Sequence, residues 1–198
     1  MFTGLIEAVG IVREVGPTPG GRILEVQSAL AAELADGDSV AVNGVCLTVT
    51  SRASSCFRAT ISPETMRVTT LGSVEAGERV NLERPLKFDG RLGGHFVLGH
   101  VDGVGSVTAV EPAGDCYWLD VDVPAGLAPL LIHKGSIALD GISLTIATLD
   151  GSRVRVQIVP FTWEHTALSA KRPGGAVNIE TDVIGKYVAR LMDQQRTL

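Results

Sequence analysis

The chain has 198 residues, 45% of them hydrophobic and 20% charged, which is ordinary for a folded globular protein. Its formal net charge of −5 and its lack of Lys/Arg clusters argue against a nucleic-acid partner, and no apolar run reaches the ~20 residues that a membrane-spanning helix needs. Three cysteines (Cys46, Cys56 and Cys116) are odd in number and irregularly spaced, which disfavours a disulfide framework and fits a reducing, cytoplasmic setting. The first residues also lack the basic flank and the cleavage site of a signal peptide.

The first half of the chain is predicted to form mainly short strands. Residues 2–15 are rich in Val and Ile and run into a Pro/Gly-rich turn signal. Residues 22–27 and 38–50 alternate polar and apolar side chains, as half-buried strands do. Between them, residues 28–35 predict one short helix capped by Ser28. Short strands with Gly-rich corners predict a small closed antiparallel barrel.

A stretch of this first half returns in the second half, and this repeat decides the organisation of the chain. Residues 39–49, Ser-Val-Ala-Val-Asn-Gly-Val-Cys-Leu-Thr-Val, match residues 136–146, Ser-Ile-Ala-Leu-Asp-Gly-Ile-Ser-Leu-Thr-Ile, at an offset of 97 residues. Upstream, from Gly4 and Gly99 onward, the offset is 95, so the second copy gains two residues in the region of the short helix. The chain is therefore predicted to be a tandem duplication of two small domains, joined by the polar link 87–94.

Each copy carries a turn-forming dipeptide inside the repeated stretch, Asn43-Gly44 in the first copy and Asp140-Gly141 in the second. Such dipeptides accept the backbone angles of tight turns, which most residues disfavour. A tight bend or a β-bulge is therefore expected at both places.

The C-terminal end has no counterpart in the first half. From Val183 onward the apolar residues recur at helical spacing, and Asp182 stands at the N-cap position. The apolar stripe consists of Ile184, Tyr187, Val188, Leu191 and Met192. A lone helix with one apolar face must bury that face, and the matching helix of a partner subunit is a good candidate for covering it.

Common signatures of chemistry are missing from the sequence, which has no P-loop, no dinucleotide-binding glycine motif and no Cys-x-x-Cys pair. His95 and His100 stand five residues apart. On a strand, that spacing places them on opposite faces, which argues against a shared metal site. His95 is interpreted as a buried or a solvent-facing histidine rather than a metal ligand.

Comparison of the two copies with each other separates shared from divergent positions. The shared positions report a common fold or a common ligand and are Gly4/Gly99, Ser39/Ser136, Gly44/Gly141, Thr48/Thr145 and Thr65/Thr162. Hydroxyl side chains in otherwise aliphatic strands either bond to the backbone or line one polar, uncharged pocket per barrel. The divergent pairs indicate specialisation and are Leu5/His100, Cys46/Ser143, Glu64/Phe161 and Pro85/Asp182. Two equivalent binding sites with unequal chemical roles would carry such differences.

Four motifs follow one another in a fixed order along the chain. They are Met1-Phe2-Thr3-Gly4-Leu5-Ile6, Asn43-Gly44-Val45-Cys46-Leu47-Thr48-Val49, Gly94-His95-Phe96-Val97-Leu98-Gly99-His100-Val101 and Asp140-Gly141-Ile142-Ser143-Leu144-Thr145. Together they resemble riboflavin synthase of the alpha-chain type. The resemblance covers the whole chain and implies an all-β fold of two tandem six-stranded Greek-key β-barrels, followed by a C-terminal α-helix that joins three chains into a homotrimer. It implies lumazine-binding barrels at 1–87 and 88–182 and an oligomerisation helix at 183–198.

The resemblance also implies a transferase reaction, the last step of riboflavin biosynthesis. Two molecules of 6,7-dimethyl-8-(1-D-ribityl)lumazine exchange a four-carbon unit, which gives riboflavin and 5-amino-6-(D-ribitylamino)uracil. One lumazine is attacked at C7 while the other loses a proton from its 7-methyl group, and the family needs no metal and no other cofactor. The protein must therefore hold two identical rings face to face. Association with lumazine synthase is left open.

The resemblance implies one substrate-binding site per barrel. The first site would use Gly4, Leu5, Ile6, Cys46, Leu47, Thr48, Thr60, Ile61, Ser62, Pro63, Glu64 and Thr65. The second would use Gly99, His100, Val101, Lys134, Ser143, Leu144, Thr145, Ile158, Val159, Pro160, Phe161, Thr162 and Trp163. The positions tied to catalysis are Phe2, Ser39, Cys46, His100, Ser143, Thr145 and Asp182.

Some of these residue types suit definite roles. His100 suits a proton carrier near neutral pH. Ser143 or Cys46 would orient or activate the nucleophile that adds at C7. Two structural alternatives stay open, in which Cys46 is a small core residue and Asp182 is only a helix cap. Phe161 departs from the first copy and is expected to alter the polarity of the second pocket.

Two other functions remain alternatives. A non-catalytic lumazine- or flavin-binding protein of the same fold needs the pocket of the first barrel but not the reactive groups of the second. The joint presence of Cys46, His100, Ser143 and Asp182 argues against it. A flavin-binding reductase barrel needs a following nucleotide-binding domain with a βαβ pattern, and the sequence shows no such pattern.

Overall fold

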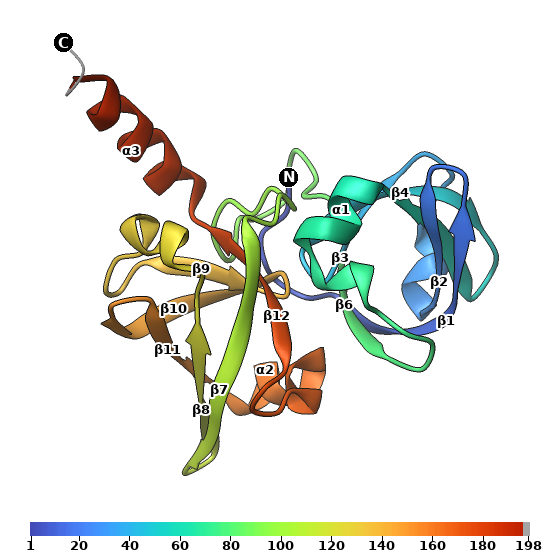
Figure 1. Ribbon diagram of the computed structural model, residues 1–198. Helices are drawn as coiled ribbons and strands as arrows, with labels where there is room; N and C mark the ends of the chain where they lie inside the picture. The colour runs from blue at the N-terminus through green and yellow to red at the C-terminus, as the bar shows by residue number, and fades with distance from the viewer. Residues whose placement is uncertain (196–198) are drawn as a thin grey trace.

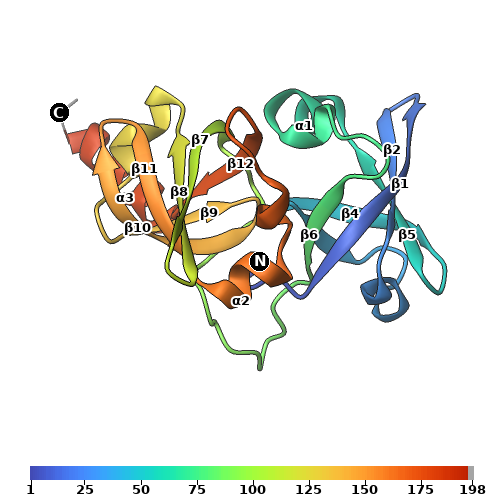
Figure 2. The same ribbon diagram turned by 90° about the horizontal axis from the view of Figure 1, so that it is seen from below.

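Two closed antiparallel barrels lie side by side in the computed structural model, which describes residues 1–195 (Figures 1 and 2). Each barrel has six strands, and a helix follows the second barrel. The fold predicted from the repeat and the resemblance is therefore confirmed.

The first barrel has the strand order β1-β2-β5-β4-β3-β6, which is a Greek key. Its strands are β1 (Ala8–Thr18), β2 (Gly21–Gln27), β3 (Ser39–Val42), β4 (Val45–Arg52), β5 (Cys56–Ile61) and β6 (Arg79–Glu83). The short helices are η1 (Ala29–Glu33), α1 (Pro63–Val68) and η2 (Thr70–Gly72). Ser28 caps η1 by accepting a hydrogen bond from the backbone N–H of Leu30, so the predicted capped helix is present as one short 3₁₀ segment.

The second barrel repeats this order as β7-β8-β11-β10-β9-β12. Its strands are β7 (Gly103–Ala113), β8 (Cys116–Asp122), β9 (Ser136–Leu139), β10 (Ile142–Asp150), β11 (Arg153–Ile158) and β12 (Ala176–Thr181). The short helices are η3 (Ala125–Leu130), α2 (Pro160–His165) and η4 (Ala167–Ala170). The two extra residues fall between β8 and β9, in the loop that holds η3, where the change of offset predicted them.

Side chains alternate between the inside and the outside of each barrel. On β4, Leu47 and Val49 are buried in the core, whereas Thr48 between them is exposed. Each barrel has its own core of aliphatic residues, and Phe57 is the large aromatic residue of the first. Outward-facing polar residues on the strands are thus available for binding, and the barrels supply the rigid support.

The repeated stretch is a β-hairpin, and its turn joins the two barrels. Asn43 (φ 46°) and Gly44 (φ 75°) connect β3 to β4, and Asp140 and Gly141 do the same for β9 and β10. Positive φ at both turn residues is the requirement of a type I′ hairpin turn, so the expected tight bend is confirmed. The two turns touch, because a Cβ on Gly44 would lie 2.6 Å from the backbone N of Gly141.

Two buried asparagines extend the contact between the barrels. Asn81 Nδ2 donates to the carbonyl of Asp140 at 3.0 Å, and Asn178 Nδ2 donates to the carbonyl of Asn43 at 2.9 Å. Their side-chain oxygens accept from backbone N–H groups of the opposite barrel, at Ala167 and Thr70 respectively. Buried amides that are satisfied in this way fix the relative orientation of the barrels.

Helix α3 (Val183–Gln195) leaves the second barrel and projects away from both barrels (Figure 1). Asp182 accepts a hydrogen bond from the backbone N–H of Ile184 at 3.0 Å, which confirms its place as the helix cap. The predicted apolar stripe is at least half exposed at all five positions. In the part of the chain that the structure describes, no helix is both long and apolar enough to cross a membrane.

Candidate functional site

Two segments of the chain cross between the barrels and bring the predicted site residues together. The N-terminal segment, residues 1–6, lies on the second barrel, where the carbonyl of Gly4 accepts from the N–H of Ser143 at 2.8 Å. Residues 99–101 lie on the first barrel, where the carbonyl of Gly99 accepts from the N–H of Cys46 at 2.9 Å. The segments pair with each other through a bridge between Phe2 and Val97. The strand expected from residue 2 therefore begins only at Ala8.

This exchange changes the grouping of the predicted binding residues. From the sequence, residues 4–6 were expected in the pocket of the first barrel and residues 99–101 in that of the second. In the structure, Ile6 packs against the core of the second barrel and Val101 against the core of the first. The grouping by barrel was wrong because it assumed that each repeat is a self-contained unit.

Close backbone approach explains the glycines in the two segments. Both have positive φ, +77° for Gly4 and +78° for Gly99. A Cβ on Gly4 would lie 2.6 Å from Cβ of Ser143, and a Cβ on Gly99 would lie 2.6 Å from Cβ of Cys46. Only glycine satisfies both the backbone angle and the contact distance.

A buried carboxylate holds each crossing segment. Glu83 accepts from the backbone N–H groups of Thr3 and Gly4, at 2.6 and 3.0 Å, and from the hydroxyl of Thr3. At the equivalent place, Glu180 accepts from the N–H groups of Leu98, Gly99 and His100, at 2.7, 3.0 and 3.1 Å. Burial raises the pKa of both carboxyls, while these hydrogen bonds act in the opposite direction. The sequence analysis missed both residues, although they recur in register in the repeat.

The first group of predicted residues is here named the Cys46 cluster and comprises Cys46 and Thr48 on β4, Thr60 on β5, Thr65 on α1 and His100 on the crossing segment. Cys46 is half-buried on the outward face of β4, and the side chains of Thr48, Thr60 and His100 are exposed. Other residues predicted for the first site lie on the same strands and at the same helix. Leu47 and Ile61 point into the barrel core, and Ser62, Pro63 and Glu64 form the exposed start of α1.

The second group, here named the Ser143 cluster, lies on β10 and α2 and comprises Ser143, Thr145, Phe161 and Trp163 together with Leu5. Phe161 is exposed and stacks on His165, whereas Trp163 stacks on Tyr117 of β8, each pair with ring centroids 4.1 Å apart. Among the other predicted residues, Ile158 is fully buried, Leu144 packs against the core, and Val159, Pro160 and Thr162 belong to the start of α2. Lys134 is exposed, and its backbone N–H donates a hydrogen bond to the carbonyl of Ile146 on β10.

Ser143 has a side-chain partner that the sequence analysis did not identify. Its Oγ lies 2.7 Å from Nδ1 of His95, which is only 8% exposed. Nε2 of this ring is buried without a partner among the described residues. Burial lowers the pKa of His95, and the charge of Asp182 partly opposes that effect. No signal in a single sequence links residues 95 and 143, because the contact depends on the crossing of the segments.

The remaining predicted catalytic residues occupy different environments. Phe2 is fully buried between the barrels and packs with Ala41, Val97, Ala138 and Cys46, so it supports the backbone at Cys46. The hydroxyls of Ser39, Thr48 and Thr145 make no hydrogen bond within the described part of the chain, so they are not bound to the backbone. Ser39 lies opposite Thr48 on the β3–β4 hairpin, as Ser136 lies opposite Thr145 on β9–β10.

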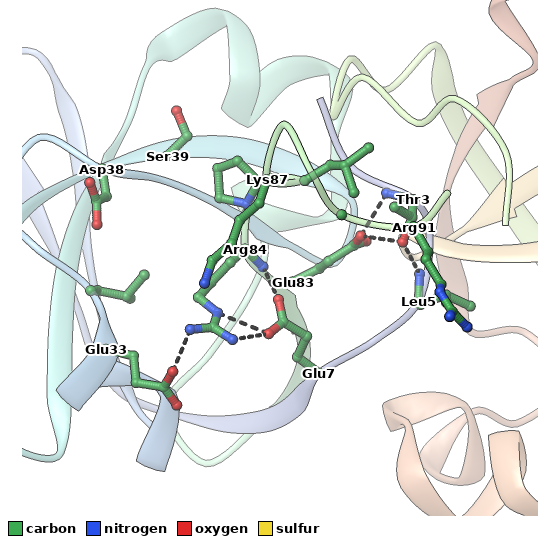
Figure 3. A pocket seen from close by; sticks show the side chains of 14 residues that line it. Thr3, Leu5, Glu7, Glu33, Asp38, Ser39, Glu83, Arg84, Lys87 and Arg91 are labelled. Atoms are coloured by element: carbon green, nitrogen blue, oxygen red, sulfur yellow. Dashed lines mark hydrogen bonds and ion pairs between the residues drawn. The ribbon is translucent and has the colours of Figure 1, made fainter. Parts of the chain in front are cut away.

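Two cavities lie at equivalent places of the two barrels. One, of about 750 Å³, is lined by Leu5, Ser39 and the link, together with the charged side chains of Glu7, Glu33 and Arg84 (Figure 3). In Figure 3, Arg84 reaches both Glu7 and Glu33, and Glu83 turns toward Thr3. The other cavity, of about 800 Å³, lies between η3 and α3 and includes Asp182. Within residues 1–195 no group of three or more His, Cys, Asp or Glu side chains is arranged to hold a metal ion.

Comparison with known proteins shows matches over nearly the whole chain. The model of the lumazine binding domain matches twice, over residues 3–85 and 98–182. The chain is 40% identical to the riboflavin synthase of Actinobacillus pleuropneumoniae over 193 residues, which covers 97% of this chain and 90% of the relative. It is also 40% identical to the riboflavin synthase of Mycobacterium tuberculosis (strain ATCC 25618 / H37Rv) over 197 residues, with 97% and 98% covered.

Solved structures of LumP have the same fold. The complex of LumP with riboflavin superposes with a TM-score of 0.86 at 23% identity, over 91% of this chain and 99% of LumP. The complex with 6,7-dimethyl-8-(1'-D-ribityl) lumazine gives a TM-score of 0.83 at the same identity and coverage. At this identity the likeness is evidence of shared architecture alone.

Proposed function

The chain belongs to the riboflavin synthase family, and from this membership we infer that it catalyses the dismutation of two 6,7-dimethyl-8-(1-D-ribityl)lumazine molecules. The products are riboflavin and 5-amino-6-(D-ribitylamino)uracil, and the reaction is the last step of riboflavin biosynthesis. The observation that carries this conclusion is the 40% identity to riboflavin synthases over 97% of the chain. The duplication agrees with it, because two like substrates need two like sites. Holding both rings in contact supplies much of the acceleration by removing the entropy cost of bringing them together.

We assign one lumazine to each cluster. The Cys46 cluster, with Gly99 and Val101, would hold one ring, and the Ser143 cluster, with Gly4 and Ile6, would hold the other. Supporting this assignment, each cluster combines outward hydroxyls, a backbone segment fixed by a buried carboxylate and a short helix. His100 is exposed and suits a proton carrier, and Ser143 or Cys46 would orient or activate the nucleophile at C7.

We further propose that the working site forms between two chains of a homotrimer, with 1–87 and 88–182 as the two binding domains and α3 (Val183–Gln195) as the oligomerisation helix. Residues 196–198 of the expected segment 183–198 lie outside the described residues. The exposed apolar stripe of α3 supports this, since such a face is normally covered. The three cysteines are free, which fits a cytoplasmic protein. Association with lumazine synthase belongs to the same proposal, and co-purification of the two proteins tests it.

A turnover assay tests the catalytic function. The purified protein is incubated with the lumazine alone, and riboflavin fluorescence is followed. We expect riboflavin and the pyrimidinedione in equal amounts. Tight binding of lumazine without riboflavin formation would instead support a non-catalytic binding protein of this fold.

A mixing experiment tests the site between chains. Because the carbonyl of Gly99 accepts from the N–H of Cys46, we assign the adjacent His100 to the Cys46 cluster. Two variants that restore each other must then carry lesions in different clusters, as Cys46→Ala and Ser143→Ala do. Mixed trimers would then contain some sites with both clusters intact and recover activity. A mixture of Cys46→Ala and His100→Ala is the matched control and should recover none, because every Cys46 cluster carries a lesion. Subunit exchange without recovery in the first mixture contradicts the proposal.

A further inference from the structure

Helix α3 is bound to the end of a crossing segment. Lys186, near the start of α3, forms an ion pair with Oδ1 of Asp102 at 2.7 Å, and both side chains are partly buried. Asp102 directly follows residues 99–101, which lie on the first barrel. Its Oδ2 accepts from the backbone N–H and the hydroxyl of Thr181, the last residue of β12, after which the chain runs into α3 (Figure 1). The start of α3 is therefore fixed to the residue that ends this segment.

Glu180 of β12 holds the same segment. Its two carboxylate oxygens accept from the backbone N–H groups of residues 98–100. The ionised carboxylate offers acceptors to all three groups, whereas protonation turns one oxygen into a donor. Burial raises the pKa of Glu180, while the hydrogen bonds and the charge of Lys186 lower it and the charge of Asp102 raises it. The cation on α3 thus favours the state of Glu180 that holds the backbone of His100.

The first copy makes the equivalent ion pair without a long helix. At the offset of 95 residues, Glu7 corresponds to Asp102. Glu7 pairs with Arg84, which directly follows β6 and leads into the link. In both copies an acid after the crossing segment therefore pairs with a cation beyond the last strand of the barrel. In the second copy that cation, Lys186, belongs to the helix with the exposed apolar face, so the segment and this helix are connected.

We propose, on the basis of the function inferred above, that Lys186 is a positioning residue of the reaction: through Asp102 and Glu180 it holds the crossing segment so that His100 stays in the Cys46 cluster as the proton carrier. Lys186 acts through the backbone of this segment and needs no contact with the substrate. The helix that joins the chains then also fixes the place of a side chain in the working site.

Two variants that break the same ion pair from opposite sides test the proposal. Lys186→Met removes the cation, so the pKa of Glu180 should rise. Asp102→Asn removes the anion, so this pKa should fall, and the side-chain oxygen of asparagine still accepts from Thr181. The readout is a pH titration of the backbone amide resonance of His100 by NMR, because this N–H donates to Glu180. We expect the midpoint to move up by about half a pH unit or more in Lys186→Met and down in Asp102→Asn. Midpoints that stay at the parent value, or that move in the same direction, would overturn the proposal.

The rate of turnover should follow these midpoints. Below the midpoint the segment is loosened, so the acidic limb of kcat should move to higher pH in Lys186→Met, with a smaller change in KM. At pH 6 we expect kcat to fall about threefold or more, and Lys186→Arg, which keeps the charge, to restore most of that loss. Sedimentation reports the assembly of each variant. Asp102→Asn leaves α3 unaltered, so its result decides the matter even where Lys186→Met changes the mass.

A double-mutant cycle distinguishes positioning from support of the helix. Glu180→Gln has no carboxyl group to titrate, so adding Lys186→Met to it should leave the pH profile of kcat unchanged. The same shift in both backgrounds would show that Lys186 does not act through Glu180. The parent protein separates the two levels of inference: without riboflavin from the parent the proposed function fails, whereas the amide titration of His100 needs no turnover and still decides the role of Lys186.

Discussion

The two barrels keep the same backbone framework but differ in the side chains exposed to a ligand. Both have the hairpin with two positive-φ turn residues, the buried asparagine and the carboxylate that holds a crossing segment. They differ at Cys46 and Ser143, and in the turn, where the first barrel has Asn43 and the second Asp140. The shared residues named here thus hold the backbone framework together, whereas Cys46 and Ser143 differ at the position that would face a substrate.

The exits from the two barrels differ as well. After β6, Arg84 forms ion pairs with Glu7 and Glu33, and the chain turns back along the first barrel as the link. After β12, Asp182 starts α3, and Lys186 of that helix pairs with Asp102 at 2.7 Å. The segment after β6 therefore connects the two domains, whereas the segment after β12 is a helix whose apolar face is available for association.

Removing this helix should produce the largest effect. Truncation after Gly185 deletes four of the five apolar stripe residues, so we expect monomers with kcat reduced by about two orders of magnitude or more, because the second ring would lose its partner cluster. Sedimentation gives the mass and the fluorescence assay the rate. Lys186→Met in the full chain is the control, since it removes only the ion pair with Asp102 and should leave the assembly intact. A fully active monomer would contradict the site between chains.

The divergent turn gives the next prediction. Asp140 is fully buried, and its carboxylate pairs with Lys171 at 2.7 Å. Lys171→Met leaves this carboxylate without its partner, which should lower the free energy of unfolding at pH 7 by about 3 to 5 kcal/mol in urea titrations. The double variant Asp140→Asn/Lys171→Met gives the second barrel the neutral turn of the first and should recover most of the loss. Unchanged stability in Lys171→Met would show that the pair contributes nothing.

The pH dependence of the same variant follows from the pKa of Asp140. Burial raises this pKa in the folded protein, with Lys171 opposing the effect. A raised pKa favours the protonated folded state, so the stability it contributes is present below the ordinary value of about 4 and is lost as the pH rises through the folded pKa. The deficit of Lys171→Met should therefore shrink as urea titrations move from pH 7 toward pH 4. A deficit independent of pH would exclude the carboxylate as its cause.

The sequence predicted those parts of the fold that leave a periodic or repeated trace. The offset between the copies located both barrels and the extra residues before β9, and the helical spacing of apolar residues from Val183 onward located the terminal helix. Helices α1 and α2 were not foreseen, since each has only six residues and too few positions to show a helical period. Prolines at Pro63 and Pro160 are the one local signal of where they begin.

The candidate site was less accessible to sequence reasoning. Cys46 and Ser143 were identified as candidate site residues because the two copies differ at this position. The segments that lie next to them, residues 4–6 and 99–101, were assigned to the wrong barrel. The crossing of the segments depends on contacts such as Gly4 with Ser143, which are far apart in sequence and follow no period. His95 was passed over for the same reason, because its partner is 48 residues away.

Making the two clusters alike at their reactive position tests whether the difference matters for chemistry. Cys46→Ser gives the Cys46 cluster the hydroxyl that the second copy carries, and the size of the side chain hardly changes. We expect lumazine binding to be retained and kcat to fall by about 10- to 1,000-fold, as for loss of one nucleophile-orienting or proton-transfer role. Cys116→Ser, in the β7–β8 hairpin, is the control for the same chemical change elsewhere. A rate near that of the parent would mean that Cys46 is a packing residue.

The smallest effect is expected where the two copies agree, at the carboxylates that hold the crossing segments. Glutamine keeps the size of Glu83 or Glu180 but turns an N–H group toward a backbone donor, so one hydrogen bond is lost. Each substitution should weaken lumazine binding about three- to tenfold, and only in the cluster that receives the segment. Trp163 belongs to the Ser143 cluster, so its emission in a Trp118→Phe background reports ligand bound there. Glu83→Gln, which loosens the segment carrying Gly4, should shift the isotherm seen by Trp163, whereas Glu180→Gln should shift only the isotherm seen by lumazine fluorescence. Equal shifts of the Trp163 signal in both variants would show that the carboxylates stabilise the pair of barrels as a whole rather than one binding cluster each.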